Sequence, residues 1–397
     1  GGDIAASGAP LDIEIRARSG VSSDASATYG AIALNGNVTT NGGWIVLGGG
    51  DTPLTDTLPA IGALGDGGNI NGIYIGPSPG NTINTGGGNF WARGRGNDLG
   101  NAQSRGFVTA QNIVTGGGDI AIAGVSGTGS AAGHGIEVYL VTVDAGGGSI
   151  ALTGTGNGSA ASMGVVLDGA IVQTAAAGTV DISGTALFAG SDGLRLQSSD
   201  VESTGFGPIA LVGTGAGGGF GISTSGTAST VGGASATGNI LILADSISLD
   251  TNFAAQTTGA IQIEPVNPGT DVFFNGTGTG LQLTSAFLGS LTGYSALLVG
   301  SPAMTGTLDV AAAFTAPAGA SIDLISGGPV TVNGALSTSG GGSIVLTSTG
   351  STVSVLAALA SGGAPILIEG DAGIDVSASI TAGGGNISLW GNSPGGT

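Results

Sequence analysis

The chain has 397 residues, of which 84 are glycine, 41% are hydrophobic and 8% are charged. Disordered chains carry more charge and less apolar surface, so this composition indicates a folded protein whose glycines have a structural purpose. The formal net charge is −19, from 25 acidic and 6 basic residues, which makes nucleic acids and anionic membranes poor partners. Cysteine is absent and histidine occurs once, so metal sites built from these ligands are excluded.

The first clear strand signal lies at residues 11–18, Leu-Asp-Ile-Glu-Ile-Arg-Ala-Arg, where apolar and charged residues alternate. Alternation with a period of two places every second side chain on one face of a strand. We therefore expect the odd-numbered residues to point into a core. The even-numbered residues, Asp12, Glu14, Arg16 and Arg18, are expected on the solvent face.

The segment 90–97, Phe-Trp-Ala-Arg-Gly-Arg-Gly-Asn, differs from the rest of the chain. Together with the loop that follows, it holds half of the arginines and one of the three tryptophans. Tryptophan and arginine are enriched in binding hot spots and attract one another through cation–π contacts. The segment thus supplies candidate contacts for a partner or glycan: Trp91, Arg93, Arg95 and Arg105. The alternative is an outer strand whose arginines neutralise nearby acids.

Two glycine motifs recur along the chain. A glycine triplet followed by alternating apolar residues begins at Gly116, Gly146, Gly340 and Gly383. A glycine followed by an apolar–x–apolar pair, with threonine as the second member after Gly106 and Gly221, begins at Gly72, Gly106, Gly135, Gly164, Gly193 and Gly221. After a longer first interval, this second motif returns every ~29 residues, which is a repeat period typical of solenoids. In the last third of the chain the period shortens to about 22 residues, as Ile322, Ile344, Ile366 and Ile387 show.

These periods predict an all-β, right-handed parallel β-helix, or β-solenoid. Three short strands with their turns make a coil of roughly 21 residues. Coils of about 29 residues add a loop between the first and second strand, at 127–134, 154–161 and 213–219. We expect loop-bearing coils over 1–262, less regular coils over 263–318 and short coils of about 22 residues over 319–397. No window has the apolar spacing of a helix, so none is expected.

Residues 370–389, Gly-Asp-Ala-Gly-Ile-Asp-Val-Ser-Ala-Ser-Ile-Thr-Ala-Gly-Gly-Gly-Asn-Ile-Ser-Leu, resemble the repeats of filamentous-haemagglutinin-like proteins. The segments 280–283, 288–292 and 297–301 are similar to a stretch common in the same family. Its members are very large bacterial surface and secreted fibres, many of them exported by two-partner secretion. The resemblance implies an extracellular or cell-surface location and a mechanical role, as a rigid stalk or adhesive filament. Its implied partners are neighbouring segments of a longer fibre and glycans of host or neighbouring cells.

Some β-helices are enzymes that cut acidic polysaccharides, which requires paired carboxylates or acids beside a basic group. The nearest acids in sequence are Asp12 with Glu14, Asp51 with Asp56, and Asp371 with Asp375, and we interpret them as solvated surface charge. His134 lies in a loop of small residues and is expected to be exposed. We predict no catalytic, cofactor or metal site. The alternatives are a polysaccharide-active enzyme and a glycan- or ice-binding surface module.

The two ends of the chain suggest a mode of assembly. Read from end to start, the termini give Thr-Gly-Gly-Asp-Ile, which is close to residues 115–120, Thr-Gly-Gly-Gly-Asp-Ile. This junction is consistent with one section of a longer array or with head-to-tail stacking. Any solenoid cut near a coil boundary would leave a similar junction, so both explanations stay open.

Overall fold

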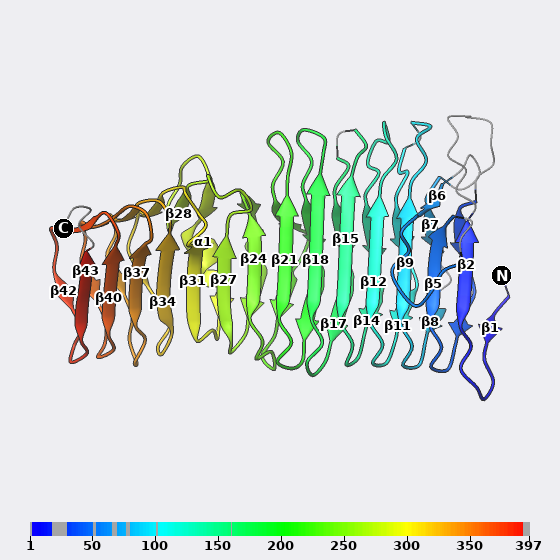
Figure 1. The fold of residues 1–397 in the computed structure, drawn as a ribbon, viewed down its shortest axis with the longest axis horizontal. Helices are drawn as coiled ribbons and strands as arrows, with labels where there is room; N and C mark the ends of the chain where they lie inside the picture. Colours follow the sequence, from blue (N-terminus) through cyan, green and yellow to red (C-terminus); the bar gives the residue numbers. More distant parts are fainter. Residues whose placement is uncertain are drawn as a thin grey trace, which may run out of the picture. The chain divides into compact units, whose positions relative to one another are not determined.

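The fold was determined as a computed structural model, which describes residues 2–17, 30–50, 53–65, 70–76, 80–100, 102–159 and 161–391. It is nearly all-β, and its strands stack in order into long parallel sheets (Figure 1). The predicted all-β parallel β-helix is therefore confirmed. The chain divides into two compact units, residues 1–237 with 248–252, and residues 238–247 with 253–397.

Unit 1 is built from coils that contribute one strand to each of three parallel sheets. The first sheet contains, in order, β2 (Ile13–Ala17), β5 (Ile45–Gly49), β9 (Phe90–Arg95), β12 (Ile120–Val125), β15 (Ile150–Gly156), β18 (Val180–Ala186) and β21 (Ile209–Thr214). The second contains β3 (Ile32–Leu34), β7 (Ile73–Ile75), β10 (Phe107–Thr109), β13 (Ile136–Tyr139), β16 (Val165–Asp168), β19 (Leu194–Gln197) and β22 (Ile222–Ser225). The third contains β1 (Ile4–Ala5), β4 (Val38–Thr39), β8 (Thr82–Asn84), β11 (Asn112–Val114), β14 (Thr142–Asp144), β17 (Ile171–Thr174), β20 (Asp200–Ser203) and β23 (Ser229–Gly232).

From residue 296 onward, unit 2 repeats this plan with shorter connections. Its first sheet contains β24 (Ile240–Ala244), β27 (Ala260–Glu264), β31 (Ala296–Ser301), β34 (Ser321–Ser326), β37 (Ile344–Ser348), β40 (Ile366–Gly370) and β43 (Ile387–Gly391). Its second contains β29 (Leu281–Leu283), β28 (Val272–Phe274), β32 (Leu308–Val310), β35 (Val330–Val332), β38 (Thr352–Val355) and β41 (Gly373–Val376). The remaining strands are β26 (Phe253–Gln256) paired with β30 (Leu291–Thr292), and β33 (Phe314–Thr315), β36 (Leu336–Ser337), β39 (Leu359–Ala360) and β42 (Ile380–Thr381) in order. Two further short strands are β6 (Ala63–Leu64), which pairs with β9 in unit 1, and β25 (Ile247–Ser248).

The register places equivalent residues of neighbouring coils beside one another. In unit 1, Ile120 pairs with Ile150 and Ile150 pairs with Val180. In unit 2 one ladder joins Ile322, Ile344, Ile366 and Ile387. The inward members of these strands, such as Ile150 and Leu152, are fully buried. The predicted loop at 127–134 falls between β12 and β13, as expected, whereas residues 154–156 still belong to β15 and residues 213–214 to β21, so those two loops begin later than predicted.

The N-terminal strand keeps only part of the predicted alternation. Ile13 and Ala17 are buried, whereas Leu11, expected to point into the core, is 38% exposed and precedes β2. On the outer face, Asp12 Oδ1 accepts a hydrogen bond from the Trp44 N–H at 3.1 Å, and Glu14 Oε1 lies 2.6 Å from Arg16 Nε. Arg18 lies outside the described residues.

The prediction of no helix is wrong at one place, α1 (Ser285–Ser290). Thr284 caps it, with its hydroxyl accepting from the Phe287 N–H, and Phe287 and Leu288 are buried. The Phe287 ring lies 6.3 Å from that of Phe253. A helix this short is stabilised by tertiary packing of its apolar side chains and not by intrinsic propensity, which is why the sequence pattern does not reveal it.

Two columns of glycine form the corner between the first and second sheets of unit 1. Gly124 and Gly154 occupy equivalent positions in β12 and β15, and Gly135 and Gly164 immediately precede β13 and β16. A Cβ on Gly124 would lie 2.0 Å from the Gly135 carbonyl oxygen, and one on Gly154 would lie 2.1 Å from that of Gly164. Real side chains do not approach a carbonyl so closely, so this corner requires glycine.

Candidate functional site

The four residues singled out in the sequence lie on two sheets of unit 1. Trp91, Arg93 and Arg95 occupy alternate positions of β9 and share its outer face, whereas Arg105 lies just before β10. The Trp91 indole N–H donates to Asp56 Oδ1 at 2.6 Å, and Arg95 pairs with Asp98 at 2.6 Å. Arg105 forms an ion pair with Glu137. Any ligand of Trp91, Arg95 or Arg105 would therefore compete with contacts that the chain already makes.

Residues of the second sheet form a polar cluster that sequence inspection missed. Besides the Arg105–Glu137 pair, Asp192 Oδ2 lies 2.7 Å from an Arg195 nitrogen and accepts from the Ser223 hydroxyl at 2.7 Å. The ladder aligns Glu137 with Val166 and Val166 with Arg195, one coil further along the solenoid each time. The regular spacing of the glycines could have revealed this column, whereas a search for acids close in sequence could not.

The expectation that His134 is an exposed loop residue is wrong. Its side chain is largely enclosed, and Nδ1 accepts a hydrogen bond from the Met163 N–H at 3.2 Å in the next coil. Burial, with smaller contributions from Arg105 and Arg195, lowers the pKa of His134 to about 3. The imidazole is therefore neutral at physiological pH and serves as an acceptor between coils.

The carboxyl of Glu137 is held in an environment that opposes its ionisation. Burial raises the pKa of Glu137, the Arg105 guanidinium lowers it in part, and Asp168 raises it further. Because Glu137 and Asp192 each pair with an arginine, the cluster neutralises its own charge. Such pairing is typical of structural ion pairs, although perturbed acids also occur at active sites.

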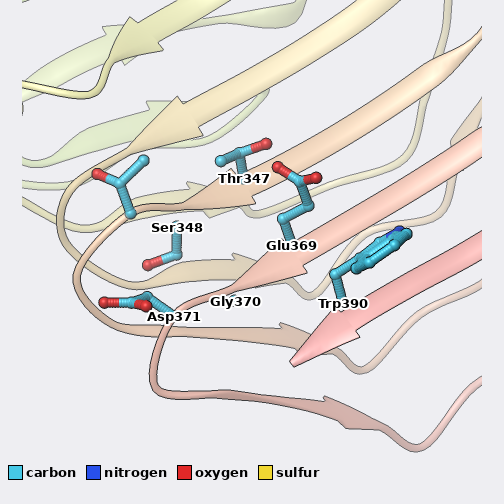
Figure 2. Close-up of a pocket in the computed structure, with 7 residues that line it drawn as sticks. Thr347, Ser348, Glu369, Gly370, Asp371 and Trp390 are labelled. Carbon is cyan, nitrogen blue, oxygen red and sulfur yellow. The ribbon is translucent and has the colours of Figure 1, made fainter. Parts of the chain in front are cut away.

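A separate cleft of about 320 Å³ lies on the first sheet of unit 2 (Figure 2). Its lining comes from β37, β40 and β43 and from the turns after β37 and β40: Thr347, Ser348, Thr349, Glu369, Gly370, Asp371 and Trp390. Trp390 is 66% exposed and stands beside Glu369. The carboxyls of Glu369 and Asp371 point in different directions in Figure 2, with Ser348 between them.

The three pairs of acids that lie close in sequence are found at different places in the fold. Glu14 Oε1 also accepts from the Leu54 N–H at 2.8 Å, so both Asp12 and Glu14 bond backbone of other segments. Asp51 lies outside the described residues, and Asp56 holds Trp91. Asp371 lines the cleft, whereas Asp375 lies on β41.

Two kinds of feature are absent from the described part of the chain. No three His, Cys, Asp or Glu side chains there group closely enough to hold a metal ion. No helix in the same residues has the length and hydropathy to span a membrane.

In comparisons with known proteins, no family model matches the chain, and neither a curated protein nor a solved structure shows significant similarity to it.

Proposed function

We propose that the chain is a structural and adhesive segment of a bacterial extracellular filament or giant surface adhesin, and that its solenoid acts as a rigid stalk. The observation that carries the proposal is the way each coil is fastened to the next. Besides the strand ladders, polar side chains bond backbone one coil away. Asn89 Oδ1 accepts from the Asp119 N–H at 2.8 Å, and Asp119 Oδ1 accepts from the Ser149 N–H at 2.8 Å.

Buried threonines add a second set of bridges at the corner after the third sheet. The Thr115 hydroxyl is shared between the carbonyls of Gly118, in its own turn, and Ala145, in the next coil. Thr85 makes the equivalent contacts to Gly88 and Thr115. Bending the coils that carry these bridges would break several bonds at once, which favours a load-bearing role. The resemblance of residues 370–389 to repeats of surface fibres supports the extracellular assignment.

Electron microscopy of the purified chain tests the stalk. We expect straight particles of uniform width whose length corresponds to about 4.8 Å per coil. Compact or freely bending particles would contradict a rigid stalk. Head-to-tail stacking would appear as particles of integral multiples of this length, and a single length at all concentrations would exclude it. Residues 394–397, which entered the terminal junction, lie outside the described residues.

The second candidate is a polysaccharide-active enzyme, and one observation favours it, namely that Glu369 and Asp371 line the same cleft. The measurement is the release of short products from neutral and acidic polysaccharides by the wild-type chain and by Glu369→Gln. Product release that disappears in Glu369→Gln would establish the enzyme. We expect neither protein to release products, since the two carboxyls point in different directions.

A further inference from the structure

We propose that the cleft over β37, β40 and β43 binds a neutral or amino-sugar oligosaccharide, with Trp390 stacking on the apolar face of a sugar ring. Such binding would supply the ligand for the adhesive role proposed above, and the inference rests on that role. The cleft is distinct from the arginine-containing surface of β9, because its residues belong to unit 2.

Trp390 belongs to a column of residues on the outer face of the sheet. Register pairs Thr347 with Glu369 and Glu369 with Trp390, so the three occupy one column on consecutive coils. Their strand neighbours Leu346 and Ile368 point inward and are fully buried. Alternation therefore sends Thr347 and Glu369 outward, and the pairing of Leu389 with Ile368 places Trp390 on the same outer face.

The residues of this column are spaced by the distance between neighbouring strands. Parallel strands lie about 4.8 Å apart, which is comparable with the width of one sugar ring. A sugar ring on Trp390 would thus have Glu369 one rung away and Thr347 two rungs away, toward the neighbouring rings of the same oligosaccharide. The column suits a linear oligosaccharide that runs across the strands.

The side chains that line the cleft present both an apolar ring and polar groups. An exposed indole combines a flat apolar face with a polar N–H, which suits a ligand that has both apolar faces and hydroxyls. Thr347, Thr349 and Glu369 supply hydroxyl and carboxylate groups, and Figure 2 shows Glu369 between Thr347 and Trp390. Ser348 is buried and its hydroxyl donates to the Gly328 carbonyl at 2.7 Å and accepts from the Ser351 N–H at 3.0 Å, so the outward groups are those of Thr347, Thr349 and Glu369.

The negative charge of the cleft selects among sugars. Among the described residues that line the cleft, two are carboxylates and none is arginine, and the chain as a whole carries a net charge of −19. Uronic or sulfated sugars would be repelled, while an amino sugar would gain an ionic contact with Glu369 or Asp371. The ligand class is therefore neutral or cationic.

Isothermal titration of the full chain with tetramers of glucosamine, glucose and galacturonic acid tests the proposal. We expect binding of glucosamine most tightly, glucose more weakly and galacturonate not at all. Trp390→Ala should weaken binding of both ligands by about tenfold, from loss of the stacking contact. Glu369→Gln should weaken glucosamine selectively, and the difference between the two sugars should shrink as salt is added.

Trp44→Ala is the matched control, because it makes the same substitution at a tryptophan of the other unit. Unchanged circular dichroism and melting temperature verify that each variant is folded. Absence of binding by any neutral or amino sugar at millimolar concentration, or equal affinity of wild type and Trp390→Ala, would overturn the proposal. The stalk is judged separately: straight particles without sugar binding reject only the cleft, and compact particles that bind sugar reject only the stalk.

Discussion

At the scale of single residues, one position shows how side chains replace backbone contacts between coils. Asn71, His134 and Asp192 each lie immediately before a glycine that opens a second-sheet strand. Each accepts a backbone N–H from the next coil, from Arg105, Met163 and Phe220 respectively. The shared requirement is a hydrogen-bond acceptor, which an amide, a neutral imidazole or a carboxylate can meet.

The variant His134→Asn isolates the titration of this position, because asparagine already performs the same task at residue 71. His134 has a pKa of about 3 in the folded chain against an ordinary value of 6.5, so the unfolded chain takes up the proton first. Its stabilising contribution is thus present above pH 6.5 and is lost as the pH falls toward 3. The wild type should lose up to about 1.4 kcal/mol per pH unit more than the variant in this range.

Urea unfolding of both proteins at pH 7.5, 6 and 4.5 measures this difference. Glu137, whose raised pKa acts in the opposite direction, is present in both proteins and largely cancels in the comparison. Free energies of unfolding that fall in parallel for the two proteins would show that His134 is not neutral and buried. A lower stability of His134→Asn at pH 7.5 would show that asparagine does not reach the Met163 N–H.

At the scale of elements, the corner between the first and second sheets depends on close backbone contact. The Gly124 and Gly154 positions pack against the carbonyls of Gly135 and Gly164, and the Gly164 position in turn packs against the Thr185 N–H of the next coil. The same residue type thus recurs once in each coil for a steric reason. Substitution there should cost more than at a glycine that only shapes a surface turn.

Gly154→Ala is therefore expected to destabilise the chain, by about 1–3 kcal/mol or more, because its Cβ would meet the Gly164 carbonyl and the backbone would have to move. Gly147→Ala is the control, since a Cβ there meets nothing within 4 Å. Gly147→Ala should change stability by at most about 1 kcal/mol, in the stabilising direction. Thermal unfolding followed by circular dichroism compares them, and equal melting temperatures would reject the steric role of the corner.

The same elements show what sequence reasoning can reach. Period-two alternation and recurring glycine predict parallel stacked strands because both features depend on local backbone geometry. Thr347, Glu369 and Trp390 follow Ile344, Ile366 and Ile387 at the same offset, so the cleft column was also implicit in that spacing. The helix α1 and the enclosure of His134 were not predictable, because both arise from packing against segments distant in the chain.

At the scale of the whole molecule, the backbone ladders and the inward apolar side chains carry no charge, although carboxylates such as Asp119 also bond the next coil. Arg16, Arg95, Arg105 and Arg195 each pair with one acid. With 25 acidic and 6 basic residues, the acids far outnumber the cations that could pair with them. Exposed apolar side chains lie among them, including Leu140 at 62% and Phe206 at 66%. Repulsion between acids then keeps these apolar groups from joining separate molecules.

This arrangement predicts that association, and not unfolding, is the first response to mild acid. As the pH falls from 7 toward the sequence pI of about 4.1, the net charge of −19 disappears while the uncharged ladders persist. Light scattering should rise steeply near pH 4–5 while the far-ultraviolet circular dichroism keeps its β signal. At pH 7, molar salt should raise scattering less, because it screens the acids without removing them. Loss of β signal before scattering rises would show instead that the coils depend on bonds from carboxylates such as Asp119 to the next coil.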